Sequence, residues 1–224
     1  MAGTIPGRRL IIAIDGPSGV GKGTVSRAVA RSLGYKHVDT GAMYRAVGWL
    51  ALDGGLSLTD EPAVSALAAR AALDVEDGRV VVCGTDVTRA VRTPEIDKAA
   101  TAVARMPTVR EILVDRQRLL GRYGGVVMEG RDIGTVVFPS ADVKIYLDAS
   151  AEERAKRRAA DPAHGGGPQE LAAVATALAA RDRIDTTRAV SPLMIAPDAV
   201  LIDTTGIPVD AVVERVMQIV RERT

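Results

Sequence analysis

Four apolar runs rich in Val, Ile and Leu recur along the chain, each followed by a polar or glycine-rich segment. They lie at 10–15, 125–129, 143–148 and 199–203. Uninterrupted apolar runs of this length are typical of parallel strands that are buried on both faces. The segments between them, such as 22–33, carry apolar residues at helical spacing. This alternation predicts an α/β fold built on a doubly wound parallel sheet.

Turn and cap residues set the bounds of the other predicted elements. The helix over 22–33 ends before Gly34, a residue suited to the C-terminal cap of a helix. A short strand over 35–39 and a helix over 41–53 follow. Further helices are predicted from Ala151 and over 94–105, 107–120, 169–185 and 208–222.

The segment 58–105 differs from the rest of the chain. Asp60 and Pro62 have the places of N-cap and first-turn residue in a predicted helix. Beyond this helix, two apolar stretches flank Asp77-Gly78, a pair typical of the type I′ turn of a β-hairpin. Antiparallel hairpins do not belong inside a parallel sheet, so we expect this segment to form a separate small module.

The chain therefore divides into a core, an insert and a lid. The stretch 161–168 is rich in glycine and proline and lies between two helices that carry arginines, which indicates a hinged lid. We expect a flexible lead-in over 1–9, a core made of 10–57, 106–150 and 190–224, an insert over 58–105, and a lid with its flanking helices over 151–189.

A glycine-rich loop joins the first predicted strand to the first helix. It reads Gly16-Pro17-Ser18-Gly19-Val20-Gly21-Lys22-Gly23-Thr24. A strand, a glycine loop and a helix that starts at a lysine form the setting of a phosphate-binding P-loop. Backbone amides converge there on an anion, and the helix N-terminus adds a partial positive charge. We expect this loop to bind the phosphate groups of a ligand, with the ammonium of the lysine on the outer ones.

The loop departs from the general P-loop pattern at its end. That pattern places Ser or Thr directly after the lysine, where the hydroxyl binds Mg²⁺. Here Gly23 intervenes before Thr24, so we leave the metal ligands open. A dinucleotide-binding fingerprint is excluded, because it requires Gly or Ala at position 24.

Composition and charge narrow the function classes. The net charge is +1, so no overall field favours nucleic acid or a membrane surface. The single cysteine, Cys83, excludes an internal disulfide framework. No apolar run approaches the length of a membrane span and no signal peptide is recognisable. We expect a soluble, cytoplasmic monomer. The chain contains no Asn, which removes the guanine-reading motif of GTPases.

Arginines near strand ends form a second candidate group. Arg181, Asp185 and Arg188 are spaced to share one helix face. Arg131-Asp132 follows the strand 125–129, at the edge of the sheet where ligands gather in such folds. The alternative is that these residues are solvated surface charges. Their place at the strand end and beyond the proposed lid favours a site.

Four motifs together resemble those of bacterial cytidylate kinases. They are the glycine loop 16–24, Asp-Thr-Gly-Ala-Met-Tyr-Arg at 39–45, Gly-Arg-Asp-Ile-Gly-Thr-Val-Val-Phe-Pro at 130–139, and Arg-Asp-Arg-Ile-Asp-Thr-Thr-Arg at 181–188. The resemblance runs from about residue 10 to the end, and 58–100 resembles the enlarged nucleoside-monophosphate-binding insert of that family. It implies transfer of the γ-phosphoryl group of ATP to CMP or dCMP, with Mg²⁺.

The resemblance also implies the site residues. ATP is expected on 16–24 and on the lid arginines Arg154 and Arg158. The acceptor nucleotide is expected on Thr40, Arg45, Thr101, Arg110, Arg131, Asp132, Arg181, Asp185 and Arg188. Asp132 is implied to read the base, and Arg188 to reach the transferring group. Three arginines are implied to hold the acceptor phosphate: Arg45, Arg110 and Arg131. The catalytic set is Lys22, Arg131, Arg181 and Arg188.

Two other functions stay open at this point. A different acceptor, such as UMP, AMP or a shikimate-like alcohol, keeps the P-loop and changes the residues opposite it. Asp132, Thr40 and Thr101 are polar groups able to read the amino edge of cytosine, which favours CMP. A nucleotide-binding regulatory module without turnover leaves the grouped arginines unexplained.

Overall fold

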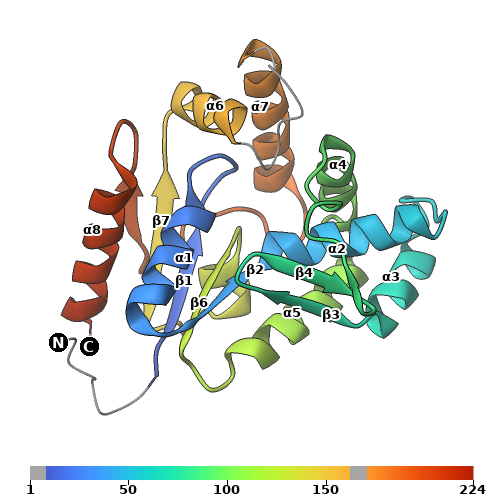
Figure 1. Cartoon of the computed structure of the whole chain (residues 1–224), viewed down its shortest axis with the longest axis horizontal. Coiled ribbons are helices and arrows are strands. Elements are labelled where there is room, and N and C mark those ends of the chain that lie inside the picture. The colour runs from blue at the N-terminus through green and yellow to red at the C-terminus, as the bar shows by residue number, and fades with distance from the viewer. Residues whose placement is uncertain (1–8, 162–170, 224) are drawn as a thin grey trace.

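A five-stranded parallel sheet forms the centre of the protein (Figure 1). The computed structural model describes residues 9–161 and 171–223. All neighbouring strands of the sheet are parallel, and the non-consecutive order confirms the predicted doubly wound α/β fold. The strands lie in the order β2 (Lys36–Asp39), β6 (Val126–Gly130), β1 (Ile11–Asp15), β7 (Val143–Asp148) and β8 (Val200–Asp203).

Alternate residues of β1 serve the two faces of this sheet. Ile12 and Ile14 pack in the cluster under α1 (Lys22–Leu33) and α8 (Val209–Glu222). Ala13 packs in the cluster on the other face, with α5 (Pro107–Gly121) and a single wide helical turn, η1 (Ile133–Val137). Burial on both faces explains why the strands are uninterrupted apolar runs.

The insert forms a second, antiparallel sheet, as predicted. Asp77 has φ 50° and Gly78 has φ 84°, the left-handed conformation that a type I′ turn requires at both positions. Asp60 caps its helix by accepting a hydrogen bond from the amide of Ala63. The elements are α3 (Glu61–Arg70), β3 (Leu73–Glu76), β4 (Arg79–Val82), β5 (Thr85–Asp86) and α4 (Pro94–Val103).

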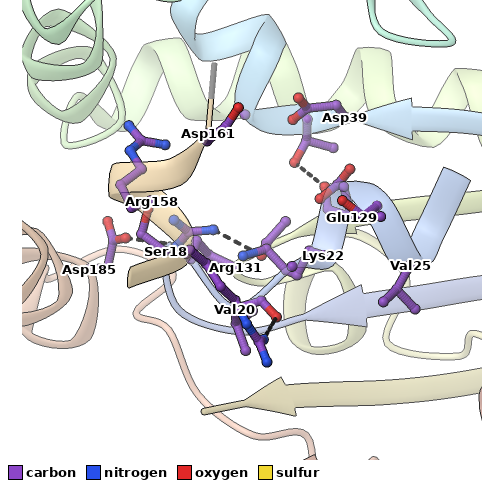
Figure 2. Close-up of a pocket in the computed structure, with 18 of the residues that line it drawn as sticks. Ser18, Val20, Lys22, Val25, Asp39, Glu129, Arg131, Arg158, Asp161 and Asp185 are labelled. Atoms are coloured by element: carbon purple, nitrogen blue, oxygen red, sulfur yellow. Dashed lines mark hydrogen bonds and ion pairs between the residues drawn. The ribbon is translucent and has the colours of Figure 1, made fainter. Parts of the chain in front are cut away.

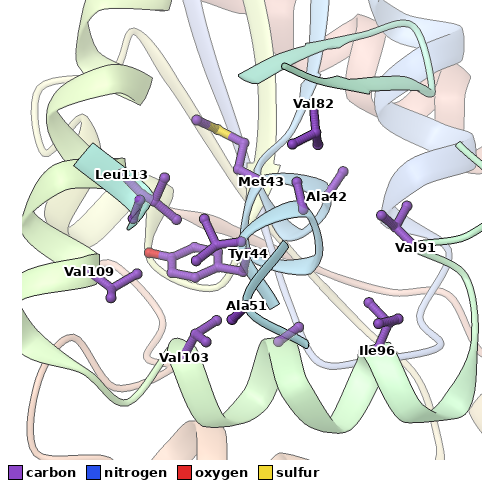
Figure 3. Packing of buried hydrophobic residues seen from close by; sticks show 14 of the residues in the cluster. Ala42, Met43, Tyr44, Ala51, Val82, Val91, Ile96, Val103, Val109 and Leu113 are labelled. Carbon is purple, nitrogen blue, oxygen red and sulfur yellow. The ribbon is translucent and has the colours of Figure 1, made fainter. Parts of the chain in front are cut away.

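The insert shares its apolar core with α2 (Thr40–Asp53). Figure 3 shows Met43 of α2 near Val82 and Leu113, which come from the insert and from α5. This cluster is separate from the two clusters that cover the parallel sheet. The helix α2 therefore joins the two parts of the molecule, and its first turn lies where they meet.

Two helices lie above the carboxyl ends of the strands in Figure 1: α6 (Ala151–Ala160) and α7 (Leu171–Thr187). They pack through a small apolar cluster of their own. The predicted lead-in, apart from Arg9, and the glycine-rich stretch from 162 onward lie outside the described residues, so the proposed hinge is not described. Within the described ranges, no helix is long and apolar enough to cross a membrane.

Candidate active site

A cleft of about 740 Å³ opens over the carboxyl ends of the parallel strands (Figure 2). One side, which we call the donor wall, consists of residues 18–24 of the glycine loop. We call the predicted acceptor residues the acceptor wall, and all of them line this cleft: Thr40, Arg45, Thr101, Arg110, Arg131, Asp132, Arg181, Asp185 and Arg188. The structure thus brings together residues from distant segments, as the function predicted for them requires.

The donor wall offers backbone donors at the start of α1. Gly21 has φ 95° and precedes the helix, and no side chain caps the amides of the first turn. Uncapped amides at a helix N-terminus are an anion-binding site. The Nζ of Lys22 donates hydrogen bonds to the carbonyls of Gly16 (2.8 Å) and Pro17 (2.7 Å). Gly16 and Pro17 themselves do not line the cleft, and they position the lysine from behind.

Burial and neighbouring arginines weaken the charge of Lys22. Its side chain is almost fully buried, and burial lowers its pKa to about 7, with further lowering by the positive charge of Arg131. Figure 2 shows Lys22 with Arg131 on one side and Glu129 on the other. Glu129 opposes the shift by raising the pKa. An anion that binds beside Lys22 raises the pKa of the lysine and so favours its protonated, charged form.

Glu129 explains why a glycine follows Lys22. A Cβ at position 23 would lie 3.3 Å from Oε1 of Glu129, closer than most side chains allow. The carboxylate cannot easily retreat, because Oε1 also pairs with Nε2 of His37 at 2.8 Å and accepts from Oγ of Ser26 at 3.1 Å. Gly23 thus lets a buried carboxylate lie against the first turn of α1.

One group of acceptor-wall residues is organised around Asp132. Arg110 pairs with Oδ2 of this carboxylate, and Nη2 of Arg188 lies 3.6 Å from Oδ1. The Arg110 guanidinium also lies over the ring of Tyr44, 5.4 Å from its centroid. Asp132 and both arginines have almost fully buried side chains. The pairing orients the carboxylate of Asp132 as a hydrogen-bond acceptor in the cleft.

The end of the acceptor wall near the donor wall is organised around Asp185. Nε of Arg131 donates to Oδ2 of Asp185 at 2.8 Å. Burial alone would raise the pKa of Asp185, but Arg131 and Arg181 lower it overall. Arg45 is held in the same way, because its Nη2 donates to Asp39 at 2.7 Å. Carboxylates thus orient the guanidinium groups on this side.

The acceptor wall keeps unused hydrogen-bond donors. Within the described residues, four buried guanidinium nitrogens of the wall have no hydrogen-bond partner: Nε of Arg45, Nε of Arg110, Nε of Arg181 and Nη2 of Arg188. A buried donor without a partner costs about 1–3 kcal/mol. Anionic oxygens of a bound substrate are the partners that guanidinium groups prefer.

Thr40 and Thr101 are each anchored to the backbone. The hydroxyl of Thr40 donates to the carbonyl of Glu129 at 2.7 Å, and that of Thr101 donates to the carbonyl of Asp97 at 2.9 Å. A hydroxyl that donates to a carbonyl keeps its lone pairs for accepting. Both residues can therefore accept a hydrogen bond from an amino group in the cleft.

The arginines of α6 divide between two tasks. Arg158 lines the cleft, as predicted for a lid arginine. Arg154 does not line it, and its Nη1 instead donates to the carbonyl of Ser18 at 3.2 Å. Arg157, the third arginine of this helix, also lines the cleft and donates to the carbonyl of Val20 at 3.1 Å. Two arginines of this helix thus brace the donor wall from above.

Asp15 is a further residue that the sequence did not identify. Its carboxylate oxygens accept hydrogen bonds from the amides of Ile133 (2.9 Å) and Gly134 (2.8 Å) and so hold η1 against β1. Burial raises the pKa of Asp15 to about 6. The sequence feature that could have identified Asp15 is a charged residue at the end of an otherwise apolar strand. Glu129, near the end of β6, shows the same feature.

Among the residues described, no group of three or more His, Cys, Asp or Glu side chains could hold an ion. Thr24 and Glu129 do line the cleft beside Lys22. Oxygens of this kind suit Mg²⁺, which keeps several waters and is commonly bound through substrate phosphates and one or two carboxylates. The residues fit an ion that arrives with a nucleotide.

The doubly wound sheet, the glycine loop and the arginines opposite it define a P-loop kinase, a class that moves phosphoryl groups from a nucleotide to an acceptor. The family model described as cytidylate kinase matches residues 12–222. The chain therefore belongs to the cytidylate kinase family.

Individual relatives agree with this assignment. The chain is 49% identical over 216 residues to a cytidylate kinase of Geobacillus sp. (strain WCH70), covering 95% of this chain and 96% of that protein. It is 50% identical over 220 residues to a cytidylate kinase of Syntrophotalea carbinolica, covering 96% and 94%. A solved shikimate kinase from Bacteroides thetaiotaomicron has a TM-score of 0.51 at 9% identity, covering 95% and 98%, and is similar in fold alone.

Proposed function

We propose that the protein transfers the γ-phosphoryl group of ATP to CMP or dCMP, which yields ADP and CDP or dCDP. The observation that carries this proposal is the acceptor wall. Its arginines face the glycine loop across one cleft and keep unused buried donors. Membership of the cytidylate kinase family supports the choice of acceptor.

The acceptor supplies its own nucleophile. A nucleotide monophosphate carries about −1.5 to −2 charge at neutral pH, so no general base is needed to ionise it. An oxygen of this phosphate forms a bond to the γ-phosphorus while the bond to the β–γ bridging oxygen breaks and ADP leaves. His37, the histidine within the described part of the chain, is fully buried against Glu129 and is no candidate base.

The cleft must offset repulsion between the substrates. Two unit charges 4 Å apart repel by about 1 kcal/mol in water and several-fold more in a drier site. The net charge of the chain is only +1, so attraction comes from the local arginines. Guanidinium groups suit this task because they bind phosphate oxygens in pairs and stay charged. Closure of α6 and α7 over the cleft would exclude water as a competing acceptor.

The geometry favours exchanging two of the roles implied by the resemblance. Figure 2 shows Arg131 beside Lys22, which puts its guanidinium near the transferring group, and its positive charge helps to lower the pKa of Lys22. Nη2 of Arg188 lies 3.6 Å from Oδ1 of Asp132, the residue expected to read the base. We therefore assign Arg131 to the transferring phosphoryl group and Arg188 to the acceptor nucleotide.

Base recognition rests on Asp132 and the threonines. Arg110 and Arg188 orient the carboxylate of Asp132, whose oxygens accept hydrogen bonds. Cytosine presents an amino group where uracil presents a carbonyl. An acceptor-only carboxylate attracts the amino group and repels the carbonyl, which favours CMP over UMP.

Mg²⁺ would be held by the nucleotide phosphates together with Thr24 or Glu129. When bound, such an ion neutralises charge on the phosphate oxygens. The division into core, insert and lid belongs to the same proposal, with residues 151–189 acting as the lid. A monomeric state and a cytoplasmic location stay predictions.

An acceptor panel tests the proposed function. ADP release is measured by a coupled assay with ATP, Mg²⁺ and each of CMP, dCMP, UMP, AMP and shikimate. We expect kcat/KM to be highest for CMP or dCMP. Faster turnover of another acceptor contradicts the assignment of Asp132. Tight ATP binding without turnover of any acceptor indicates the regulatory module instead.

A further inference from the structure

A carboxylate of the insert pairs with arginines of both helices that lie above the strand ends. Asp97 belongs to α4, and its Oδ2 pairs with Nη2 of Arg158 in α6. Nη1 of Arg181 in α7 lies 3.5 Å from Oδ1 of the same carboxylate. Figure 2 shows the Arg158 side chain extending out from the α6 ribbon. One insert residue thus contacts both helices of the proposed lid.

This contact is well shielded from solvent. The Asp97 side chain is 14% exposed, and those of Arg158 and Arg181 are each 20% exposed. Burial lowers the pKa of Arg181, as does the charge of Arg131, whereas Asp97 raises it. The carboxylate therefore compensates positive charge that is crowded into the cleft.

The arginines that Asp97 holds are cleft-lining residues placed to meet phosphate. A phosphate group and a carboxylate use the same guanidinium donors, and a phosphate carries the larger charge. We propose that Asp97 is an internal substitute for substrate phosphate: it holds Arg158 and Arg181 in place until nucleotide phosphates displace it. This inference rests on the proposed phosphotransferase function and adds a positioning residue to it.

Displacement would also separate two parts of the molecule. Thr101 lies one turn beyond Asp97 on α4, and its hydroxyl donates to the Asp97 carbonyl. Asp97, through which α4 contacts α6 and α7, is therefore hydrogen-bonded to Thr101, a residue predicted to bind the acceptor. Substrate binding would exchange a contact between insert and lid for contacts with phosphate.

Removing the charge of Asp97 tests the proposal. Asp97→Asn keeps the shape and removes the competing anion. We expect ATP and CMP to bind roughly threefold to tenfold more tightly, by isothermal titration calorimetry at low salt, because a part-buried charge pair no longer has to be broken. Cytidine, which lacks phosphate, should bind with unchanged affinity.

Glu95→Gln is the matched control. Glu95 is exposed in the first turn of the same helix, and the substitution removes the same charge. We expect the control to leave both nucleotide affinities within experimental error. Equal tightening in both variants would show a long-range charge effect and overturn the specific role of Asp97.

A purely structural role makes a different prediction. In that case Asp97→Asn lowers the melting temperature and leaves nucleotide binding unchanged or weaker, which contradicts the proposal. In an Arg158→Ala background, the tightening caused by Asp97→Asn should shrink. If the wild-type protein turns over CMP but Asp97→Asn binds ATP and CMP no more tightly than the wild type, only this inference is refuted. Absence of turnover in the wild type refutes the proposed function itself.

Discussion

The two walls of the cleft bind anions by different means. The donor wall is one continuous segment, residues 18–24, and its binding groups are mostly backbone amides at the start of α1. The acceptor wall is assembled from side chains on several elements, each guanidinium held by a carboxylate. A backbone wall depends on the conformation of one loop. A side-chain wall depends on pairs that only the fold brings together.

This difference determines how each wall responds to substitution. The donor wall has a single charged side chain to lose, so removing it should abolish most of the activity. The acceptor wall distributes its positive charge over several arginines, so each substitution should weaken one step. The experiments below separate these two behaviours.

The largest effect is expected from Lys22→Ala. The variant should fold, because the hydrogen bonds of the lysine within the described residues go to two carbonyls of its own loop. Loss of the ammonium removes stabilisation of charge on the transferring group, and kcat should fall by about 1,000-fold. Lys36→Ala is the control, since Lys36 is an exposed lysine paired with Glu76, and it should retain wild-type rates. Near-normal turnover in Lys22→Ala would remove the basis for the donor wall.

Substitutions of Arg131 and Arg188 test whether the acceptor wall divides its work. Arg131→Ala should lower kcat by about 100-fold, because the charge next to Lys22 is lost. Arg188→Ala should mainly raise the KM for CMP, because the guanidinium beside Asp132 is lost. Steady-state kinetics with ATP and CMP varied separately distinguishes the two outcomes. The reverse pattern restores the roles that the family resemblance implied.

The pH dependence of ATP binding follows from the pKa of Lys22, which is lowered to about 7. A bound phosphate favours the ammonium form and raises this pKa, so binding takes up a proton above pH 7. ATP affinity should be flat just below pH 7 and fall by up to about tenfold per pH unit above it. Titration calorimetry from pH 6.5 to 8.5 in buffers of different ionisation enthalpy measures this uptake. Lys22→Met should show no such proton uptake.

The donor wall could be predicted in detail because its information is local. The glycine spacing, the lysine and the apolar strand before them lie within one segment, and the structure forms α1 over the residues expected. The insert was predictable for the same reason, since Asp77-Gly78 specifies its own turn. Local signals of this kind survive in a single sequence because they do not depend on distant partners.

The partners of the acceptor wall could not be predicted from spacing. Arg110 meets Asp132 and Arg131 meets Asp185 only after the sheet and α7 are in place. The sequence placed these residues in one site through family resemblance, and no periodicity indicates which carboxylate holds which guanidinium. Asp97 was missed for this reason, because its arginines belong to helices remote in sequence.

The smallest effect is expected from Arg157→Ala, which tests whether side chains of α6 hold the backbone wall in shape. Arg157 donates to the carbonyls of Val20 (3.1 Å) and Thr204 (2.6 Å), so its loss should lower the free energy of unfolding by about 1–3 kcal/mol. The KM for ATP should rise about threefold with kcat little changed, because a loosened loop still presents its amides and Lys22. Lys156→Ala is the control on the same helix, since Lys156 is exposed and pairs with Glu152 at 2.7 Å, one turn away. A loss of stability in Arg157→Ala with an unchanged KM for ATP would mean that the donor wall keeps its shape without this brace.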